Sequence, residues 1–219
     1  MELLITRHGE TEWNAQDRLQ GHMDSPLTEL GLKQASFLGE AARNAQVTCV
    51  YSSDLGRAFQ TAALAAAVLN CDHVLITNLR EQCLGVLEGL TRSEAQKKYP
   101  ETYEAYIQRS AIPSMSGLES WDGVYDRTVE VLSHLAKSHT GQTVLVVCHG
   151  GNLDAAFRMA VGIPRRAVRR FSLRNASLSR FQYRKGTWKL MEWGTPVALY
   201  LTNKGAQPTP CSGPRKLDR

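Results

Sequence analysis

The chain has 219 residues and 42% of them are hydrophobic, which is enough for one domain with a well-formed core. Its longest uninterrupted apolar stretch is the eight residues from Ala62 to Leu69, which cannot cross a bilayer, so we expect no membrane association. Much of the net charge of +5 lies at 165–170 and 215–219, where no aromatic interleaving accompanies it, and we therefore expect no nucleic-acid partner.

The first half of the chain predicts strands that alternate with helices. Leu3 to Thr6 is apolar and too short for an independent helix, so it predicts a buried strand. A polar, turn-prone loop at 18–26 follows it. The spacing of apolar residues then predicts a helix at 27–45 with Thr28 as N-cap, a strand at 47–52, a helix at 55–69 and a strand at 74–77.

The second half begins with a loop at 78–89 and continues the alternation. The capping box from Thr91 to Glu94 opens a helix that ends before Pro100. The remaining pattern predicts a helix at 100–109, a mobile connection at 111–117, a helix from about 124 to the stop at Gly141, a buried strand at 143–148, a helix at 152–161 and a hairpin of strands at 178–183 and 187–193.

These elements define the expected fold class and domain organisation. Strands alternating with helices favour a three-layer α/β/α sandwich whose sheet is mostly parallel, with an antiparallel edge strand from the hairpin. We expect a single domain over residues 1–202. Residues 203–219 contain prolines and glycines without any period, which predicts a disordered tail.

Five cysteines are widely scattered and form no Cys-x-x-Cys pair, so neither a disulfide framework nor a zinc module is expected. Met1 and Glu2 lead directly into the first strand, leaving no room for a cleavable leader. We therefore expect a cytoplasmic protein with reduced, buried thiols.

Chemically active side chains follow the predicted strands. Arg7 and His8 follow the first strand, Arg57 lies in the first turn of the helix after the second, Glu81 follows the third and His149 follows the fourth. The carboxyl ends of parallel strands meet at one edge of a sheet, where ligands bind. Buried charge without a partner is costly, so this group of arginines, histidines and a carboxylate is more easily explained as a site than as core packing.

These residue types fit an anionic tetrahedral substrate such as phosphate. The planar guanidinium of arginine matches phosphate oxygens, and a neutral histidine can attack phosphorus. A glutamate can protonate the leaving oxygen; Glu81 is the first candidate, and Glu88 in the same loop is an alternative. No cysteine is followed by arginine six positions later, and neither a Gly-x4-Gly-Lys-Ser/Thr loop nor a His-Glu-x-x-His motif is present, which excludes three rival chemistries.

The order of these motifs resembles the histidine phosphatase superfamily, also called phosphoglycerate mutase-like, over about Leu3 to Tyr183. Within it, the chain is most similar to bacterial phosphatases once labelled as probable phosphoglycerate mutases. The resemblance is carried by Arg7-His8-Gly9-Glu10-Thr11, Trp13-Asn14, Gly21, Asp24-Ser25-Pro26-Leu27-Thr28, Ser52-Ser53-Asp54-Leu55-Gly56-Arg57-Ala58, Leu79-Arg80-Glu81, Glu88-Gly89 and Val147-Cys148-His149-Gly150.

The resemblance implies a role for each of these residues. His8 is the phosphorylated nucleophile and Glu81 the proton donor. The phosphate pocket is formed by Arg7, Arg57 and His149, with Asn14, Gln20, Gly21 and Gly150 as further substrate-binding residues. It implies a small phosphomonoester as substrate and neither a metal nor another cofactor.

Hydrolysis, mutase activity and binding without catalysis remain alternatives at this stage. The resembling mutases carry a longer, more basic insert, whereas residues 82–117 contribute only Arg92, Lys97, Lys98 and Arg109 as basic residues, which favours a hydrolase. The aromatic residues Tyr99, Tyr103, Tyr106 and Trp121 are candidates to line a leaving-group pocket, and the hairpin edge makes a homodimer possible.

Overall fold

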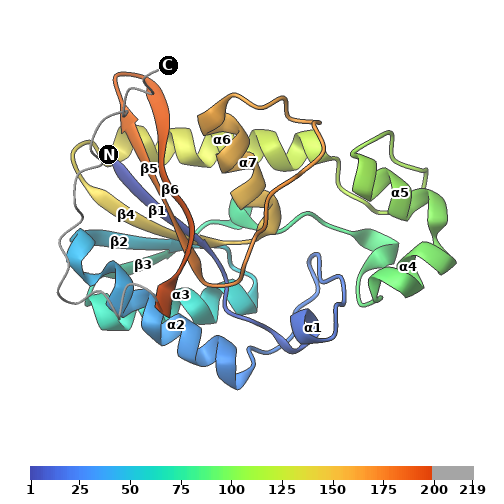
Figure 1. Cartoon of the computed structure of the whole chain (residues 1–219), viewed down its shortest axis with the longest axis horizontal. Coiled ribbons are helices and arrows are strands. Elements are labelled where there is room, and N and C mark those ends of the chain that lie inside the picture. Colours follow the sequence, from blue (N-terminus) through green and yellow to red (C-terminus); the bar gives the residue numbers. More distant parts are fainter. Residues whose placement is uncertain (199–219) are drawn as a thin grey trace, which may run out of the picture.

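A computed structural model describes residues 1–198 of the chain, and these residues form a six-stranded sheet with helices on both faces (Figure 1). The strand order is β3-β2-β4-β1-β5-β6. The strands are β1 (Glu2–Arg7), β2 (Val47–Ser52), β3 (Asp72–Leu75), β4 (Thr143–Cys148), β5 (Ser177–Arg184) and β6 (Thr187–Pro196). The pairs among β1 to β4 are parallel, whereas β5 runs antiparallel to both β1 and β6. The predicted fold class is therefore confirmed.

Seven α-helices and three short 3₁₀ segments connect these strands within the described residues. The α-helices are α1 (Glu12–Ala15), α2 (Glu29–Ala42), α3 (Gly56–Leu69), α4 (Arg92–Lys98), α5 (Pro100–Gln108), α6 (Trp121–Ser138) and α7 (Gly150–Val161). The 3₁₀ segments are η1 (Arg43–Ala45), η2 (Thr77–Leu79) and η3 (Gly85–Leu87).

Alternating side chains of the central strands build two separate cores. On one face, Leu4 of β1 and Val147 of β4 pack with side chains of α2 and α3. On the other face, Leu3, Ile5 and Val146 pack with side chains of α6 and α7. Both faces of β1 and β4 are covered, which explains their nearly continuous apolar sequence.

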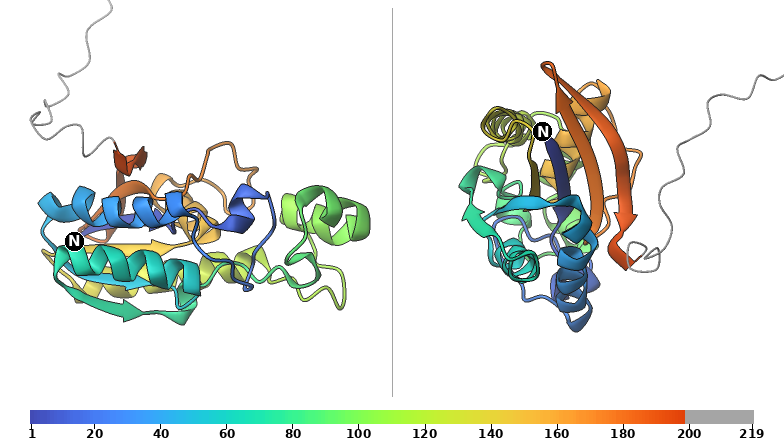
Figure 2. Two further views of the ribbon diagram at one scale, coloured as in Figure 1. Left: turned by 90° about the horizontal axis from the view of Figure 1, so that it is seen from below. Right: turned by 90° about the vertical axis from the view of Figure 1, so that its left-hand side faces the viewer.

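Helices α4 and α5 form a small lobe beside the carboxyl ends of the parallel strands (Figures 1 and 2). The lobe has a core of its own, in which Leu87, Ala95 and Ala105 are buried. Pro100 occupies the first turn of α5, where its missing N–H costs nothing, and Thr91 caps α4 through the predicted capping box. The lobe therefore forms one wall of the space above the sheet edge.

Several predicted boundaries differ from the observed ones, including the start of α6, which lies at Trp121 rather than near residue 124, and the end of β6, which lies at Pro196 rather than 193. Strand β3 begins and ends two residues earlier than predicted, because it is a mostly exposed edge strand without a clear apolar signal. The helix predicted over 27–45 is α-helical only from Glu29 to Ala42 and ends in η1. Helix α7 starts at Gly150, two residues earlier than predicted, directly after His149.

Within residues 1–198, no helix is long and apolar enough to cross a membrane. The four cysteines in this part of the chain are free thiols; Cys49 and Cys148 are buried as predicted, whereas Cys71 and Cys83 are only partly buried. The fifth, Cys211, and the predicted tail at 203–219 lie outside the described residues.

Candidate active site

Strands β1 and β4 place two histidines side by side at the carboxyl edge of the sheet. The two strands are parallel neighbours in register, with Arg7 opposite Cys148, so His8 and His149 occupy equivalent places beyond their ends. The centroids of the two imidazole rings are 5.2 Å apart. His8 is 1% exposed and His149 is fully buried.

The tautomer of His8 follows from its contact with the next residue. Nδ1 lies 2.7 Å from the carbonyl oxygen of Gly9, which can only accept, so Nδ1 carries the proton and Nε2 keeps its lone pair. Burial, together with the positive charges of Arg57 and Arg7, holds the pKa of His8 well below its ordinary value of 6.5. His8 is therefore a neutral imidazole whose Nε2 carries a lone pair.

Arg57 is held in place by the loop that precedes α2. Its Nε donates to His8 Nε2 at 3.2 Å, while Nη2 donates to the carbonyl oxygen of Gly21 at 2.8 Å. Nη1 donates to the carbonyl oxygen of Met23 and to the carboxylate of Asp24, each at 2.8 Å. Gly21 adopts a positive φ of 55°, and a Cβ there would lie 2.1 Å from Glu88, so this turn requires glycine.

Several buried polar atoms next to His8 lack a partner within the described residues. They are Nε of Arg7, Oε1 of Gln20 and both ring nitrogens of His149. Burying such atoms without hydrogen bonds costs free energy. A bound anion would offset part of this cost, because its oxygens can accept hydrogen bonds from the nitrogen donors among them. Burial and the charge of Arg57 also hold the pKa of His149 well below 6.5, so an N–H of the neutral ring is available as a donor.

Glu81 faces the amino-terminal end of α7. Its carboxylate accepts from the backbone N–H of Gly151 at 3.1 Å and from that of Gln82 at 2.9 Å. The backbone of Glu81 is fixed from behind, since Nη2 of Arg127 donates to its carbonyl oxygen at 3.1 Å and Arg127 in turn pairs with Glu119 at 2.8 Å. Glu119 thus supports the Glu81 loop through Arg127.

The alternative carboxylate, Glu88, has a different environment. Its Oε1 accepts from the backbone N–H groups of His22 and Leu84, both at 2.9 Å, and it does not line the cavity that contains His8. The geometry therefore favours Glu81 over Glu88 as the group that reaches a substrate.

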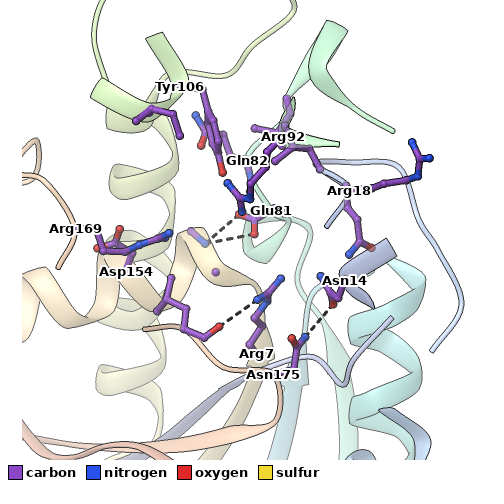
Figure 3. A pocket seen from close by; sticks show the side chains of 18 of the residues that line it. Arg7, Asn14, Arg18, Glu81, Gln82, Arg92, Tyr106, Asp154, Arg169 and Asn175 are labelled. Carbon is purple, nitrogen blue, oxygen red and sulfur yellow. Dashed lines mark hydrogen bonds between the residues drawn. The ribbon is translucent and has the colours of Figure 1, made fainter. Parts of the chain in front are cut away.

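A cavity of about 510 Å³ lies above the sheet edge, between the central sheet and the lobe of α4 and α5 (Figure 3). Eight of the nine predicted site residues line it: Arg7, His8, Asn14, Gln20, Gly21, Arg57, Glu81 and Gly150. The ninth, His149, is fully buried next to the ring of His8 and is not a lining residue.

Asn175 is a lining residue that the sequence did not indicate. Its Nδ2 donates to the carbonyl oxygen of His8 at 3.0 Å and to Oδ1 of Asn14 at 3.1 Å (Figure 3). Asn14 also accepts from the N–H of Thr11, and Gln20 Nε2 donates to the Thr11 hydroxyl at 2.8 Å. Asn175 thus connects the nucleophile loop to α1, although it lies in an irregular loop with no pattern that could reveal it.

The candidate aromatic residues fall into two groups. Tyr106 and Trp121 line the cavity, and Arg109 stacks on Trp121 with its guanidinium carbon 3.7 Å from the ring centroid. Tyr99 and Tyr103 pack instead against the core of the α4–α5 lobe. Only half of the predicted aromatic set therefore faces the site.

Metal-binding side chains do not gather in the part of the chain that the structure describes, where no group of three or more His, Cys, Asp or Glu residues has a suitable arrangement. The positive charge at the site comes from arginines.

Comparison with known proteins shows which family this chain belongs to. Residues 3–196 match the family described as "Histidine phosphatase superfamily (branch 1)". A metal-independent phosphoserine phosphatase from Arabidopsis thaliana is 37% identical over 88% of this chain and 80% of its own. The probable phosphoglycerate mutase GpmB from Salmonella choleraesuis is 37% identical over 90% of this chain and 92% of its own.

A solved structure, Bacillus stearothermophilus YhfR, superposes with a TM-score of 0.82 at 30% identity and covers 89% of this chain and 96% of its own. The fold is thus shared with this solved structure over most of both chains. The chain belongs to the histidine phosphatase superfamily, branch 1, which confirms the resemblance inferred from its sequence.

Proposed function

We propose that this histidine phosphatase hydrolyses small phosphomonoesters through a phosphorylated His8. The observation that carries the proposal is the neutral His8, whose Nδ1–H is bound to the Gly9 carbonyl while Nε2 lies beside Arg57 in the cavity. This arrangement aims the lone pair of the nucleophile at the place where the arginines would hold a phosphate group.

In the first step, Nε2 of His8 forms a bond to phosphorus as the bond from phosphorus to the alcohol oxygen breaks. Protonated Glu81 gives its proton to the departing oxygen. The Gly9 carbonyl accepts from Nδ1–H at 2.7 Å and so stabilises the positive charge that the imidazole gains. Arg7, Arg57 and His149 donate hydrogen bonds to the phosphoryl oxygens, and the Arg57 Nε–H turns from His8 to one of them.

In the second step, a water oxygen forms a bond to phosphorus and the bond from phosphorus to Nε2 breaks. The Glu81 carboxylate takes a proton from this water, so inorganic phosphate leaves and both His8 and Glu81 return to their starting states. The fixed charges of the arginines balance the phosphoryl group, and no step calls for a metal ion.

A comparison of wild type with His8→Ala tests this function. Each protein is incubated with an aryl phosphate and a panel of phosphomonoesters, and inorganic phosphate is followed with time. We expect release by the wild type and its loss in the variant. If neither protein releases phosphate from any compound, the chain is a phosphate-binding protein without catalysis and the proposal is wrong.

A mutase dependent on 2,3-bisphosphoglycerate is the second candidate, because the relative GpmB is named a probable phosphoglycerate mutase and two arginines of the insert, Arg92 and Arg109, line the cavity. Lys97 and Lys98 do not line it. Incubation with 3-phosphoglycerate, with and without 2,3-bisphosphoglycerate, separates the two activities. A mutase forms 2-phosphoglycerate only with the bisphosphate, whereas a hydrolase releases phosphate without it.

The cytoplasmic location and the possible homodimer remain predictions from the sequence. Size-exclusion chromatography with light scattering tests the second of them.

A further inference from the structure

The cavity carries more positive charge than one phosphate group offsets. Its charged lining residues are the arginines Arg7, Arg18, Arg57, Arg92, Arg109 and Arg169, and the carboxylates Asp17, Glu81 and Asp154. A phosphate dianion at His8 would lie next to Arg7 and Arg57, of which Arg57 is also paired with Asp24 at 2.8 Å. None of the other four arginines hydrogen-bonds to His8 among residues 1–198, and Arg18, Arg92 and Arg169 lie away from Arg7 in the cavity (Figure 3).

Three of these four arginines already have carboxylate partners. Arg18 pairs with Glu94 at 3.2 Å, Arg92 pairs with Asp17 at 3.0 Å, and Arg109 pairs with Asp154. Asp154 also pairs with the buried Arg158 at 2.6 Å. One carboxylate thus neutralises only one of two guanidinium groups, and the group formed by Arg109, Arg158 and Asp154 keeps a net positive charge.

Arg169 differs from the others because it has no hydrogen bond or ion pair with any residue among 1–198. It lies in the loop between α7 and β5, and its side chain is on the same side of the cavity as Asp154, away from Asn14 and Arg18 (Figure 3). Its charge reaches into the cavity, since it contributes to lowering the pKa of Arg7.

Tyr106 of the α4–α5 lobe lines the same part of the cavity, and within the described residues its hydroxyl has no hydrogen-bond partner. Burial raises the pKa of this phenol, which therefore keeps its proton and can donate. The apolar side chains Ile107, Val168 and Phe171 also line the cavity, although Ile107 and Val168 are exposed to solvent.

We propose that the substrate's leaving group carries a second anionic group, a carboxylate or a second phosphate, and that Arg169 binds it together with the Tyr106 hydroxyl. This inference rests on the proposed hydrolase function and narrows its substrate class. Arg169 is then a specificity-determining residue that contacts the leaving group and takes no part in the bond-breaking steps.

Two pairs of substrates test this inference, because the members of each pair differ by the second anion. Phosphoserine is compared with phosphoethanolamine, which lacks the carboxylate, and 1,3-propanediol bisphosphate is compared with propyl phosphate. The ratio of kcat/KM within each pair is measured for wild type, Arg169→Gln and Arg170→Gln. The last variant removes the same charge one residue along the loop, from a side chain that is exposed and does not line the cavity.

We expect kcat/KM of the wild type to be higher for the anionic member of at least one pair by about tenfold or more, which is the effect expected of one charge-assisted hydrogen bond. The pair with the larger ratio identifies the anion as carboxylate or phosphate. Arg169→Gln should reduce that ratio toward one, mainly through KM, whereas Arg170→Gln should keep it.

Turnover of both members with equal kcat/KM by the wild type would overturn the inference and leave the hydrolase function intact. A ratio that survives in Arg169→Gln would also overturn it. If the wild type releases phosphate from none of these compounds or from an aryl phosphate, the proposed function fails and the inference fails with it.

Discussion

At the scale of single residues, the chemistry depends on which carboxylate can reach the leaving oxygen. Glu81 lines the cavity and its carboxylate accepts from the N–H of Gly151 at 3.1 Å, at the start of the helix that follows His149. Glu88 is tied to the backbone of His22 and Leu84 away from the cavity. The two glutamates of one loop thus have separate tasks: Glu81 faces the substrate and Glu88 organises the loop.

Replacing each glutamate by glutamine separates these tasks. Glu81→Gln keeps the shape of the side chain but removes the transferable proton, so we expect kcat for alkyl phosphomonoesters to fall by about 10²- to 10⁴-fold. Aryl phosphates should be affected less, because a phenolate leaves without protonation. Steady-state kinetics with both substrate types measures the difference.

Glu88→Gln is the matched control for this prediction. This variant should not reproduce the dependence on the leaving group, because Glu88 accepts from the backbone N–H groups of His22 and Leu84 and does not line the cavity. A Glu88→Gln variant that loses alkyl phosphate turnover selectively, while Glu81→Gln retains it, would reverse the assignment.

At the scale of elements, α3 presents Arg57 to the site only because another segment completes its first turn. The N-cap residue of α3, Leu55, has no side chain that can accept a hydrogen bond. The carboxylate of Asp24 takes this place: it accepts from the backbone N–H of Gly56 and, at 3.3 Å, from that of Arg57, and it pairs with the Arg57 guanidinium at 2.8 Å. The loop at 18–26 therefore caps a helix and orients a functional arginine at the same time.

Removal of this carboxylate should affect both stability and activity. We expect Asp24→Ala to lower the free energy of unfolding by about 1 kcal/mol, the usual effect of losing an N-cap. We also expect kcat/KM to fall by about tenfold or more, because Arg57 loses a charged partner. Urea unfolding and phosphate release measure the two effects.

The control is Glu40→Ala, which removes an exposed carboxylate that pairs with Arg43 on the surface of α2. This variant should change stability by less than about 1 kcal/mol and leave kcat/KM unchanged. Equal losses of activity in the two variants would show that Asp24 has no special relation to Arg57.

At the scale of the whole molecule, burying two neutral histidines among arginines makes folding sensitive to pH. Burial and the neighbouring arginines lower the pKa values of His8 and His149 below the ordinary 6.5. Below pH 6.5 the two histidines therefore bind protons in the unfolded chain but remain neutral in the folded one. Stability therefore falls as the pH drops below 6.5, by up to about 1.4 kcal/mol per pH unit for each histidine.

Urea unfolding at several pH values between about 5 and 7.5 measures this dependence. The double variant His8→Asn/His149→Asn should show a shallower loss of stability on acidification than the wild type. If both proteins lose stability with the same slope, the buried histidines do not cause the effect.

Because arginines line the cavity, we expect phosphate release not to depend on a metal ion. Because the charge of the phosphoryl group is balanced by guanidinium groups in the proposed mechanism, treatment with EDTA should leave the rate of phosphate release unchanged within about a factor of two. Loss of turnover on chelation, restored by a divalent cation, would contradict the mechanism.

The sequence predicted the central sheet and most of the cavity lining because both have strong local signals. Strands β2 and β4 lie at the predicted residues, since strands buried in a parallel sheet are continuous apolar runs. Arg7, His8 and Arg57 could be placed because each follows such a strand directly or begins the next helix. The exposed edge strand β3 lacks this signal, and its predicted position was wrong by two residues.

The rest of the site could not be predicted, because it depends on contacts between distant segments. Asn175 and Arg169 lie in the loop at 162–176, which has no period, and reach the cavity only through the path of the chain. The support of Glu81 by Glu119 through Arg127 likewise joins residues that are far apart in sequence. Such contacts cannot be predicted from the composition of the chain or from the spacing of its residues.

The most direct test of the central claim is to trap the phosphorylated enzyme. Wild type is mixed with a rapidly hydrolysed aryl phosphate and quenched in base, since phosphohistidine is labile to acid, and the site of modification is mapped by mass spectrometry. The account predicts one phosphoryl group on His8 that is absent from His8→Asn. Phosphorylation of a different residue, or turnover by His8→Asn at the wild-type rate, would contradict it.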